Sequence, residues 1–101
     1  STVDFEGTLE SLFGRMTINK VRGLAVGIIE AIESVHNDNI AHTQINARNI
    51  VVVRGVFKLT NFGHAVFNPS RELRFEDYNS FGRTLAVLAE SMMLDSLLLK
   101  K

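Results

Sequence analysis

The sequence predicts a mainly helical α+β fold, and three patterns along the chain indicate it. Apolar residues recur at helical spacing over residues 17–37 and again over about 77–93. Between these segments, residues 50–59 contain two short runs rich in β-branched residues around a glycine turn, which is the pattern of a β-hairpin. Two helices and a hairpin can share one small core, so we expect residues 1–101 to form a single domain.

The composition excludes several classes of protein. Hydrophobic residues make up 46% of the 101 residues, and 11 basic side chains balance 11 acidic ones, so the formal net charge is zero. A neutral globular chain lacks the basic patch that attracts nucleic acid or anionic lipid, and we expect neither as a partner. No apolar run approaches the ~18 residues of a membrane span.

Cysteine is absent, so the chain has no disulfide and no thiolate metal site. This agrees with a reducing compartment, and we expect the cytosol or the nucleus. The sequence begins with serine rather than methionine, and we expect it to be a piece of a longer or processed chain.

The first half of the chain contains two expected helices. A short helix over residues 7–14 is bounded by glycines and capped by Thr8. A long helix follows with Thr17 as its N-cap, and its two glycines, Gly23 and Gly27, indicate close packing against a neighbouring element. The apolar stripe of the long helix consists of Ile18, Val21, Leu24, Ala25, Ile28, Ile29, Ile32 and Val35.

The second half begins with the hairpin, which is predicted to turn at Arg54 and Gly55. Residues 64–76 include the only proline together with mixed charges, so we expect an irregular loop there. The last helix is expected to begin near Asp77 and to leave an apolar, helical tail after Met93. Its helical spacing is carried by Phe81, Leu85, Leu88 and Met92.

Two motifs flank the hairpin. His42 and Asn49 bound the loop His-Thr-Gln-Ile-Asn-Ala-Arg-Asn before it, and Asn61-Phe62-Gly63 follows it. This order resembles the protein-kinase family, in which a helix leads to a catalytic loop His-Arg-Asp-x-x-x-x-Asn, a short hairpin and then Asp-Phe-Gly. The end of the loop, Asn-Ala-Arg-Asn, is similar to the Ala-Ala-Arg-Asn of tyrosine kinases.

Two further stretches extend the resemblance. The segment from Asp77 to Gly82 is similar to the Asp-Val-Trp-Ser-Phe-Gly that opens a central helix of the kinase C-lobe, and Glu6-Gly-Thr-Leu resembles the stretch just after the hinge between the lobes. The resemblance implies a truncated kinase C-lobe made of a short helix, a long helix, a catalytic-loop remnant, a β-hairpin and a central helix.

The departures from the family predict that the chain is not an enzyme. Gln44 stands where the family has its catalytic Asp, and an amide cannot act as a base near neutral pH. Asn61 stands where an Asp ligates Mg²⁺, and its neutral oxygen is a poorer ligand for a hard cation. Asn49 is retained, but a single amide is a weak site for Mg²⁺. The sequence also contains no Gly-rich loop or paired lysine of the N-lobe. We expect no cofactor.

The resemblance also implies structural roles for three retained residues. His42 and Phe62 are expected to stack in the interior of the lobe, while Asp77 accepts hydrogen bonds from the backbone of the loop around His42 and Thr43. We expect no metal site, because His36, His42 and His64 share no ligand-like spacing.

An apolar surface after the last helix leads to the functional hypotheses. In a kinase C-lobe, further helices cover the central helix, so the apolar residues here risk exposure and mark either a protein-binding surface or an unstable truncation. These residues are Met92, Met93, Leu94, Leu97, Leu98 and Leu99.

The first hypothesis is a regulatory pseudokinase fragment that binds a protein partner and inhibits or scaffolds a true kinase by mimicking a kinase lobe. An alternative is a fragment of a larger kinase-homology domain, from a receptor or scaffold, with residual nucleotide binding or an unconventional nucleotide-dependent activity. A third hypothesis is a structural remnant with no activity of its own.

Overall fold

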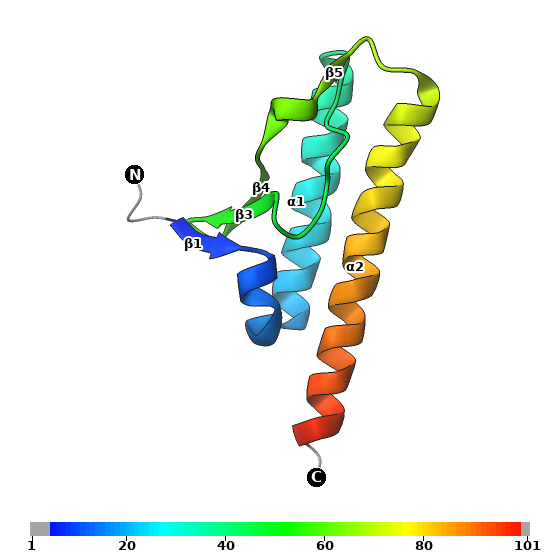
Figure 1. Cartoon of the computed structure of the whole chain (residues 1–101). Coiled ribbons are helices and arrows are strands. Elements are labelled where there is room, and N and C mark those ends of the chain that lie inside the picture. The colour runs from blue at the N-terminus through cyan, green and yellow to red at the C-terminus, as the bar shows by residue number, and fades with distance from the viewer. Residues whose placement is uncertain (1–4, 100–101) are drawn as a thin grey trace.

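The computed structural model describes residues 5–99, which form an α+β fold (Figure 1). Two α-helices, α1 (Ile18–Asn37) and α2 (Arg71–Leu99), lie side by side, and a small antiparallel sheet packs against α1. The mainly helical α+β prediction is therefore confirmed.

The long helix α1 begins and ends where the sequence predicted. The Thr17 side chain accepts a hydrogen bond from the backbone N–H of Lys20, with 3.3 Å between the heavy atoms, so Thr17 is the N-cap. Leu24, Ile28 and Ile32 are completely buried. The predicted stripe was too wide, because Ile18 and Ile29 lie at its edges and are 66% and 41% exposed.

The sheet contains the predicted hairpin and one strand that was not predicted. Its order is β1 (Phe5–Thr8), β3 (Ile50–Val53) and β4 (Val56–Leu59), all antiparallel. The hairpin turns through Arg54 and Gly55, whose φ angles of 52° and 75° are both left-handed. Two left-handed residues suit the twist of a two-residue hairpin, so this prediction is confirmed.

The predicted helix over residues 7–14 was wrong in its first part. Residues 5–8 form β1 because their backbone pairs with β3, and Gly7 adopts a φ of 131° at an irregularity of the pairing. The short helix that follows, η2 (Glu10–Arg15), is a 3₁₀ helix with Leu9 at the N-cap position. The Thr8 hydroxyl still accepts the N–H of Ser11 at 3.2 Å, so the expected capping contact is present one residue away.

Residues 64–76 are also more ordered than predicted. After η3 (Phe62–His64), they contain a short strand, β5 (Val66–Phe67), which pairs with β2 (Ile40–Ala41). Helix α2 then begins at Arg71 instead of Asp77. The Ser70 hydroxyl accepts the N–H of Leu73 at 3.2 Å, as an N-cap does, so the proline just before Ser70 marks a helix start and not a continuing loop.

The core lies between the hairpin, η2 and the inner faces of the two helices. A Cβ at Gly27 would lie 3.5 Å from the Phe57 carbonyl oxygen, which is an ordinary van der Waals contact, and a Cβ at Gly23 would have no neighbour within 4 Å, so neither glycine is required for the close packing that the sequence predicted. The buried core consists of Leu9, Leu12, Leu24, Ile28, Ile32, Ile45, Ile50, Val52, Phe57, Phe81 and Leu88.

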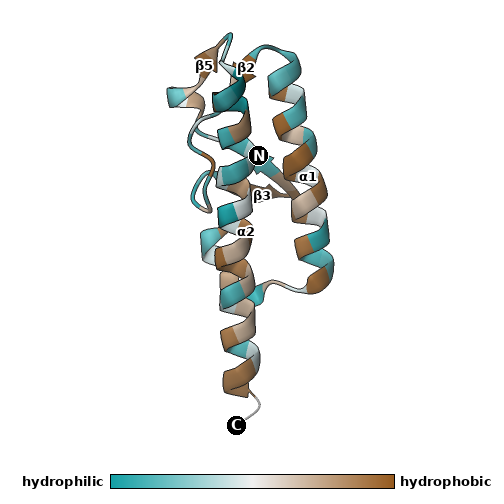
Figure 2. Cartoon of the chain, turned by 90° about the vertical axis from the view of Figure 1, so that its right-hand side faces the viewer, coloured by the Kyte–Doolittle hydropathy of each residue, from teal (hydrophilic) through white to brown (hydrophobic). Residues whose placement is uncertain are grey.

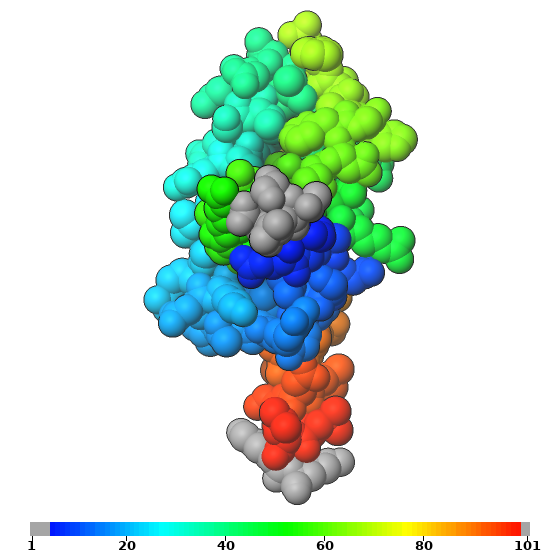
Figure 3. All heavy atoms as spheres, turned by 90° about the vertical axis from the view of Figure 1, so that its left-hand side faces the viewer, coloured from blue at the N-terminus to red at the C-terminus, as the bar shows by residue number. Residues whose placement is uncertain are grey.

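The last turns of α2 project beyond this core (Figures 1 and 3). A helix of 29 residues is about 44 Å long at 1.5 Å per residue, which accounts for most of the 51 Å long axis of the molecule. The Cα radius of gyration is 14.4 Å, above the ~13 Å of a compact chain of 100 residues.

Candidate functional site

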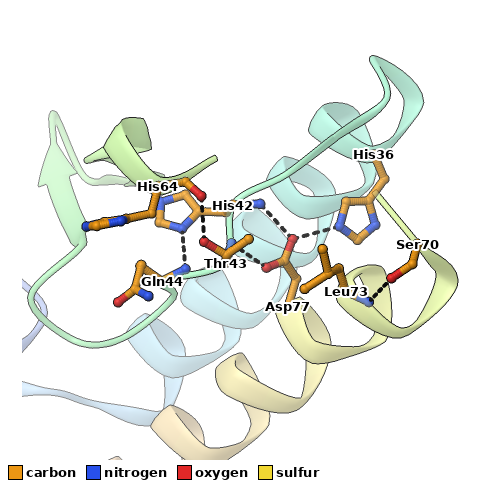
Figure 4. Close-up of polar contacts among 8 residues, drawn as sticks. All are labelled: His36, His42, Thr43, Gln44, His64, Ser70, Leu73 and Asp77. Atoms are coloured by element: carbon orange, nitrogen blue, oxygen red, sulfur yellow. Dashed lines mark hydrogen bonds and ion pairs between the residues drawn. The ribbon is translucent and has the colours of Figure 1, made fainter. Parts of the chain in front are cut away.

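A buried carboxylate, Asp77, joins α2 to the loop that precedes the hairpin (Figure 4). Its Oδ2 accepts the backbone N–H of His42 and its Oδ1 accepts that of Thr43, both at 2.9 Å. Its side chain is only 1% exposed. Three donors satisfy the charge in place of water, since Nε2 of His36 also donates to Oδ2 at 2.8 Å. The expected contact between Asp77 and the backbone of the loop is present.

Two features of this carboxylate were not predicted. Asp77 lies inside α2, nearly two turns after Arg71, and not at the start of the helix as predicted. The role of His36 was missed, although it lies four residues after the buried Ile32 on the same face of α1. That spacing was the available signal that the His36 ring turns inward.

His42 is completely buried and both of its ring nitrogens are occupied. Nε2 donates to the Thr60 carbonyl at 2.7 Å, and Nδ1 accepts the backbone N–H of Gln44 at 3.1 Å. Because a carbonyl only accepts and an N–H only donates, the ring is neutral with its proton on Nε2. His42 therefore connects the loop to the end of β4 and has no nitrogen left for chemistry.

Thr43 adopts a left-handed conformation with a φ of 72°, which is strained for a β-branched residue. Two hydrogen bonds hold it there. Its N–H donates to Asp77, and its hydroxyl donates to the His64 carbonyl at 2.8 Å. The same carboxylate thus fixes the conformation of the loop as well as its position.

The structure brings Asn49 and Asn61 together. The Asn61 amide donates to the Asn49 side-chain oxygen at 3.2 Å, and the Asn49 amide donates to the Gln44 carbonyl at 2.6 Å. The NH₂ group of each side chain therefore donates a hydrogen bond to an oxygen of a nearby residue. The Gln44 side chain is exposed, makes no hydrogen bond within residues 5–99 and points away from Asp77 (Figure 4).

The prediction that Phe62 lies in the interior was wrong. Its ring meets the His42 ring edge to face, with the centroids 4.8 Å apart, but 43% of Phe62 is exposed. The reason is that η3, which carries Phe62 and Gly63, lies at the surface and has no buried residue.

The chemistry of this region follows from its residue types. Neither residues 42–49 nor residues 61–63 include a carboxylate. Two carboxylates bond to them: the buried Asp77, which is occupied by three donors, and the exposed Glu10, which accepts from Nε of Arg48 at 3.2 Å. Within residues 5–99, no group of three or more His, Asp or Glu side chains is arranged to hold a metal ion. The loop is held by hydrogen bonds among neutral groups, by one buried anion, Asp77, and by one exposed ion pair between Arg48 and Glu10.

Tyr78 lies next to this network. Its ring meets the His36 ring edge to face at 5.5 Å between centroids. Burial raises the pKa of Tyr78 above its ordinary value of 10.0, and the negative charges of Glu33 and Asp77 add to the effect.

The predicted partner-binding residues lie at the projecting end of α2, where Figure 2 colours most residues as hydrophobic, with a few hydrophilic ones between them. One of them was wrongly expected to be exposed, since Met92 is partly buried and packs against the core. The others are exposed by 57% to 86%: Met93, Leu94, Leu97, Leu98 and Leu99.

An apolar groove of about 350 Å³ separates the first half of α1 from α2 and ends at this surface. Its walls are Ile18, Val21 and Ala25 from α1, and Leu85, Leu88, Ala89 and Met92 from α2.

A scan against known protein families finds no match, and a search among curated proteins finds no similar sequence. None of the helices within residues 5–99 is long and apolar enough to cross a membrane.

Proposed function

We propose that the chain is a catalytically inactive, truncated kinase C-lobe that acts as a protein-binding module. The order of its elements supports the proposal: a long helix, a loop anchored by a buried Asp, a hairpin and a central helix follow one another as the resemblance implies. The contact between Asp77 and the backbone of His42 and Thr43 supports it further, because it joins two motifs that are 34 and 35 residues apart.

The amides of the loop support the absence of catalysis. Gln44 is exposed and carries no base, and the neutral side chains of Asn49 and Asn61 bond to each other. The chain keeps most of the uncharged residues of the two catalytic motifs, but an amide residue stands at each of the two positions where the family has a catalytic Asp. Transfer of phosphate also needs groups that position the nucleotide, and the 101 residues include none of the N-lobe groups that do so.

A phosphate-transfer assay on the original chain and on one double variant tests this part of the proposal. The purified chain is expected to transfer no labelled phosphate from Mg²⁺-ATP to itself or to a generic substrate, and the double variant Gln44→Asp, Asn61→Asp is expected to remain inactive. Turnover by either protein that disappears with Asn49→Ala would contradict the assignment.

The observation that carries the binding function is the exposed apolar end of α2. Full burial of a leucine or methionine side chain contributes roughly 1.5–3 kcal/mol, so five such residues left in water favour association with a partner. Five of residues 93–99 are apolar, and only Asp95 and Ser96 interrupt them. The groove between α1 and α2 extends the same apolar surface toward the core.

The partner that best fits the resemblance is a true protein kinase, because a surface that further C-lobe helices cover in the family is open here. By binding a kinase through this surface, the chain would inhibit or scaffold it without catalysis of its own.

A binding assay against a panel of purified kinase catalytic domains tests the partner. Saturable binding to at least one kinase is expected, and the double variant Leu94→Glu, Leu98→Glu is expected to lose roughly tenfold or more in affinity. The matched control is Asn19→Glu, Asn79→Glu, which adds the same charge at exposed polar positions and should bind normally. If no kinase binds, or if both double variants bind alike, the partner is not a kinase that uses this surface.

A further inference from the structure

A second pocket lies at the opposite end of α2 from the apolar surface. It has a volume of about 280 Å³ and forms where the last turn of α1 meets the first two turns of α2. Its lining is basic and aromatic, and consists of His36, Asn37, Arg71, Arg74, Phe75 and Tyr78.

Two arginines on one wall of the pocket have no acidic partner. Arg71 and Arg74 are three residues apart and therefore neighbours on the same face of α2. Within residues 5–99, neither forms an ion pair. Two adjacent positive charges repel each other, so an anion between them would be stabilised by both guanidinium groups.

His36 adds a polar atom to the opposite wall. Its side chain is 10% exposed, and its Nε2 is held by Asp77, so the ring cannot turn freely. Its Nδ1 has no hydrogen-bond partner within residues 5–99. Because no fully buried side-chain nitrogen or oxygen there lacks a partner, this nitrogen reaches solvent, and His36 lines the pocket.

Two aromatic rings complete the pocket. Phe75 is 58% exposed and lies four residues after Arg71, and Tyr78 is 38% exposed and lies four residues after Arg74. Each ring therefore stands one helical turn from an arginine. Two acidic groups act on Tyr78 at this end of the molecule: Glu33, three residues before His36, and Asp77. The Asp77 carboxylate is already occupied by three hydrogen-bond donors, so it does not neutralise the two arginines by direct contact.

We propose that this pocket binds a phosphate monoester carried on an aromatic ring, namely the phosphotyrosine side chain of a partner protein. Arginine forks match the oxygens of a phosphate, which carries up to two negative charges and three acceptor oxygens. The exposed Phe75 ring offers a face on which the ligand ring packs. The site lies apart from the apolar end of α2 and does not depend on the proposed function.

NMR titration of the ¹⁵N-labelled chain with an N-acetyl phosphotyrosine amide tests the proposal. Saturable shifts are expected at residues 36–37 and 71–78, and the unphosphorylated tyrosine amide should produce none. The double variant Arg71→Gln, Arg74→Gln is expected to bind roughly tenfold or more weakly. The control Lys20→Gln, Arg22→Gln removes the same charge from exposed positions of α1 and should bind as the original chain does.

Three further probes separate the sources of the ligand. Inorganic phosphate should bind more weakly than the blocked phosphotyrosine, and a phosphotyrosine peptide should bind at least as tightly as phenyl phosphate. Equal affinity for inorganic phosphate would overturn the role of the rings, and weaker binding of the peptide would overturn a protein as the source. Shifts that do not saturate, or an equal loss in both double variants, would overturn the site itself.

Discussion

The two halves of α2 have opposite surroundings. In the part up to Leu88, Asp77, Phe81 and Leu88 are at most 2% exposed, and this part lies against the loop, η2 and α1. In the second half, residues 93–99 are all exposed and project beyond the core (Figure 3). One continuous helix thus has a part that specifies the fold and a part that the fold does not need.

The difference shows how a single polar residue can organise a small core. Apolar contacts hold α2 against α1, but they do not fix the conformation of the loop before the hairpin. Asp77 does so, because its carboxylate must find donors once it is buried, and the backbone of His42 and Thr43 supplies two of them. The apolar end has no such constraint, so a partner can cover it without any change in the fold.

Removing the Asp77 carboxylate is expected to have the largest effect on stability of the changes that compare the two parts of α2. Asp77→Ala leaves two backbone N–H groups and His36 without an acceptor, and we expect it to lower the free energy of unfolding by about 4 kcal/mol in urea titration. Asp95→Ala, in the exposed half, should change it by no more than ~0.5 kcal/mol.

A mild effect of Asp77→Ala, similar to that of Asp95→Ala, would show that Asp77 is an ordinary surface residue. Asp77→Asn provides a second comparison, because an amide keeps one acceptor oxygen but turns an NH₂ group toward a donor. It should fall between the original chain and the alanine variant.

Two leucines of α2 give the next comparison. Leu88→Ala removes a side chain that is 1% exposed and should lower the free energy of unfolding by about 3 kcal/mol. Leu98→Ala removes one that is 66% exposed and should change it by less than ~0.5 kcal/mol. Thermal or urea unfolding measures both. A large loss for Leu98→Ala would mean that the end of α2 is already covered in the free protein.

The smallest expected effect is a change in the pKa of Tyr78, which reports on the packed part of α2. It is the only tyrosine, so its absorbance change reports one group, and we expect its pKa above 10.0 because burial and then Glu33 and Asp77 disfavour the phenolate. A pKa raised by folding contributes stability below pH ~10 that is lost as pH rises through the folded value. Glu33→Gln should lower this pKa slightly. A pKa at or below 10.0 would contradict the packing around His36 and Tyr78.

Much of the fold could be predicted because local signals agree with long-range packing. Thr17 is a good N-cap before a clear apolar stripe, and the glycine turn at residues 54–55 suits a hairpin, so both elements lie where the sequence placed them. The contact of Asp77 with the loop could be predicted only through the resemblance to kinases. Nothing in local spacing places residue 77 beside residue 42.

The remaining features depend on distant partners or on ambiguous local signals. Residues 5–8 form a strand because their backbone pairs with the edge of β3. This pairing depends on residues 51–53, so the local sequence does not predict it. The start of α2 was hidden because Pro69 and Ser70 suit both a loop and a helix N-terminus. The exposure of Phe62 depends on what covers η3, and the sequence of this element alone does not contain that information.

Amide hydrogen exchange along α2 tests the central claim most directly, since it compares the two halves in one experiment. We predict slow exchange, close to the rate of global unfolding, for residues 77–88, and fast exchange for residues 95–99, whose turns lie outside the core. Addition of a saturating kinase partner should slow exchange at 95–99 and leave 77–88 unchanged. Strong protection at 95–99 in the free chain would contradict the account, because the apolar end would then be covered already and would not be open to a partner.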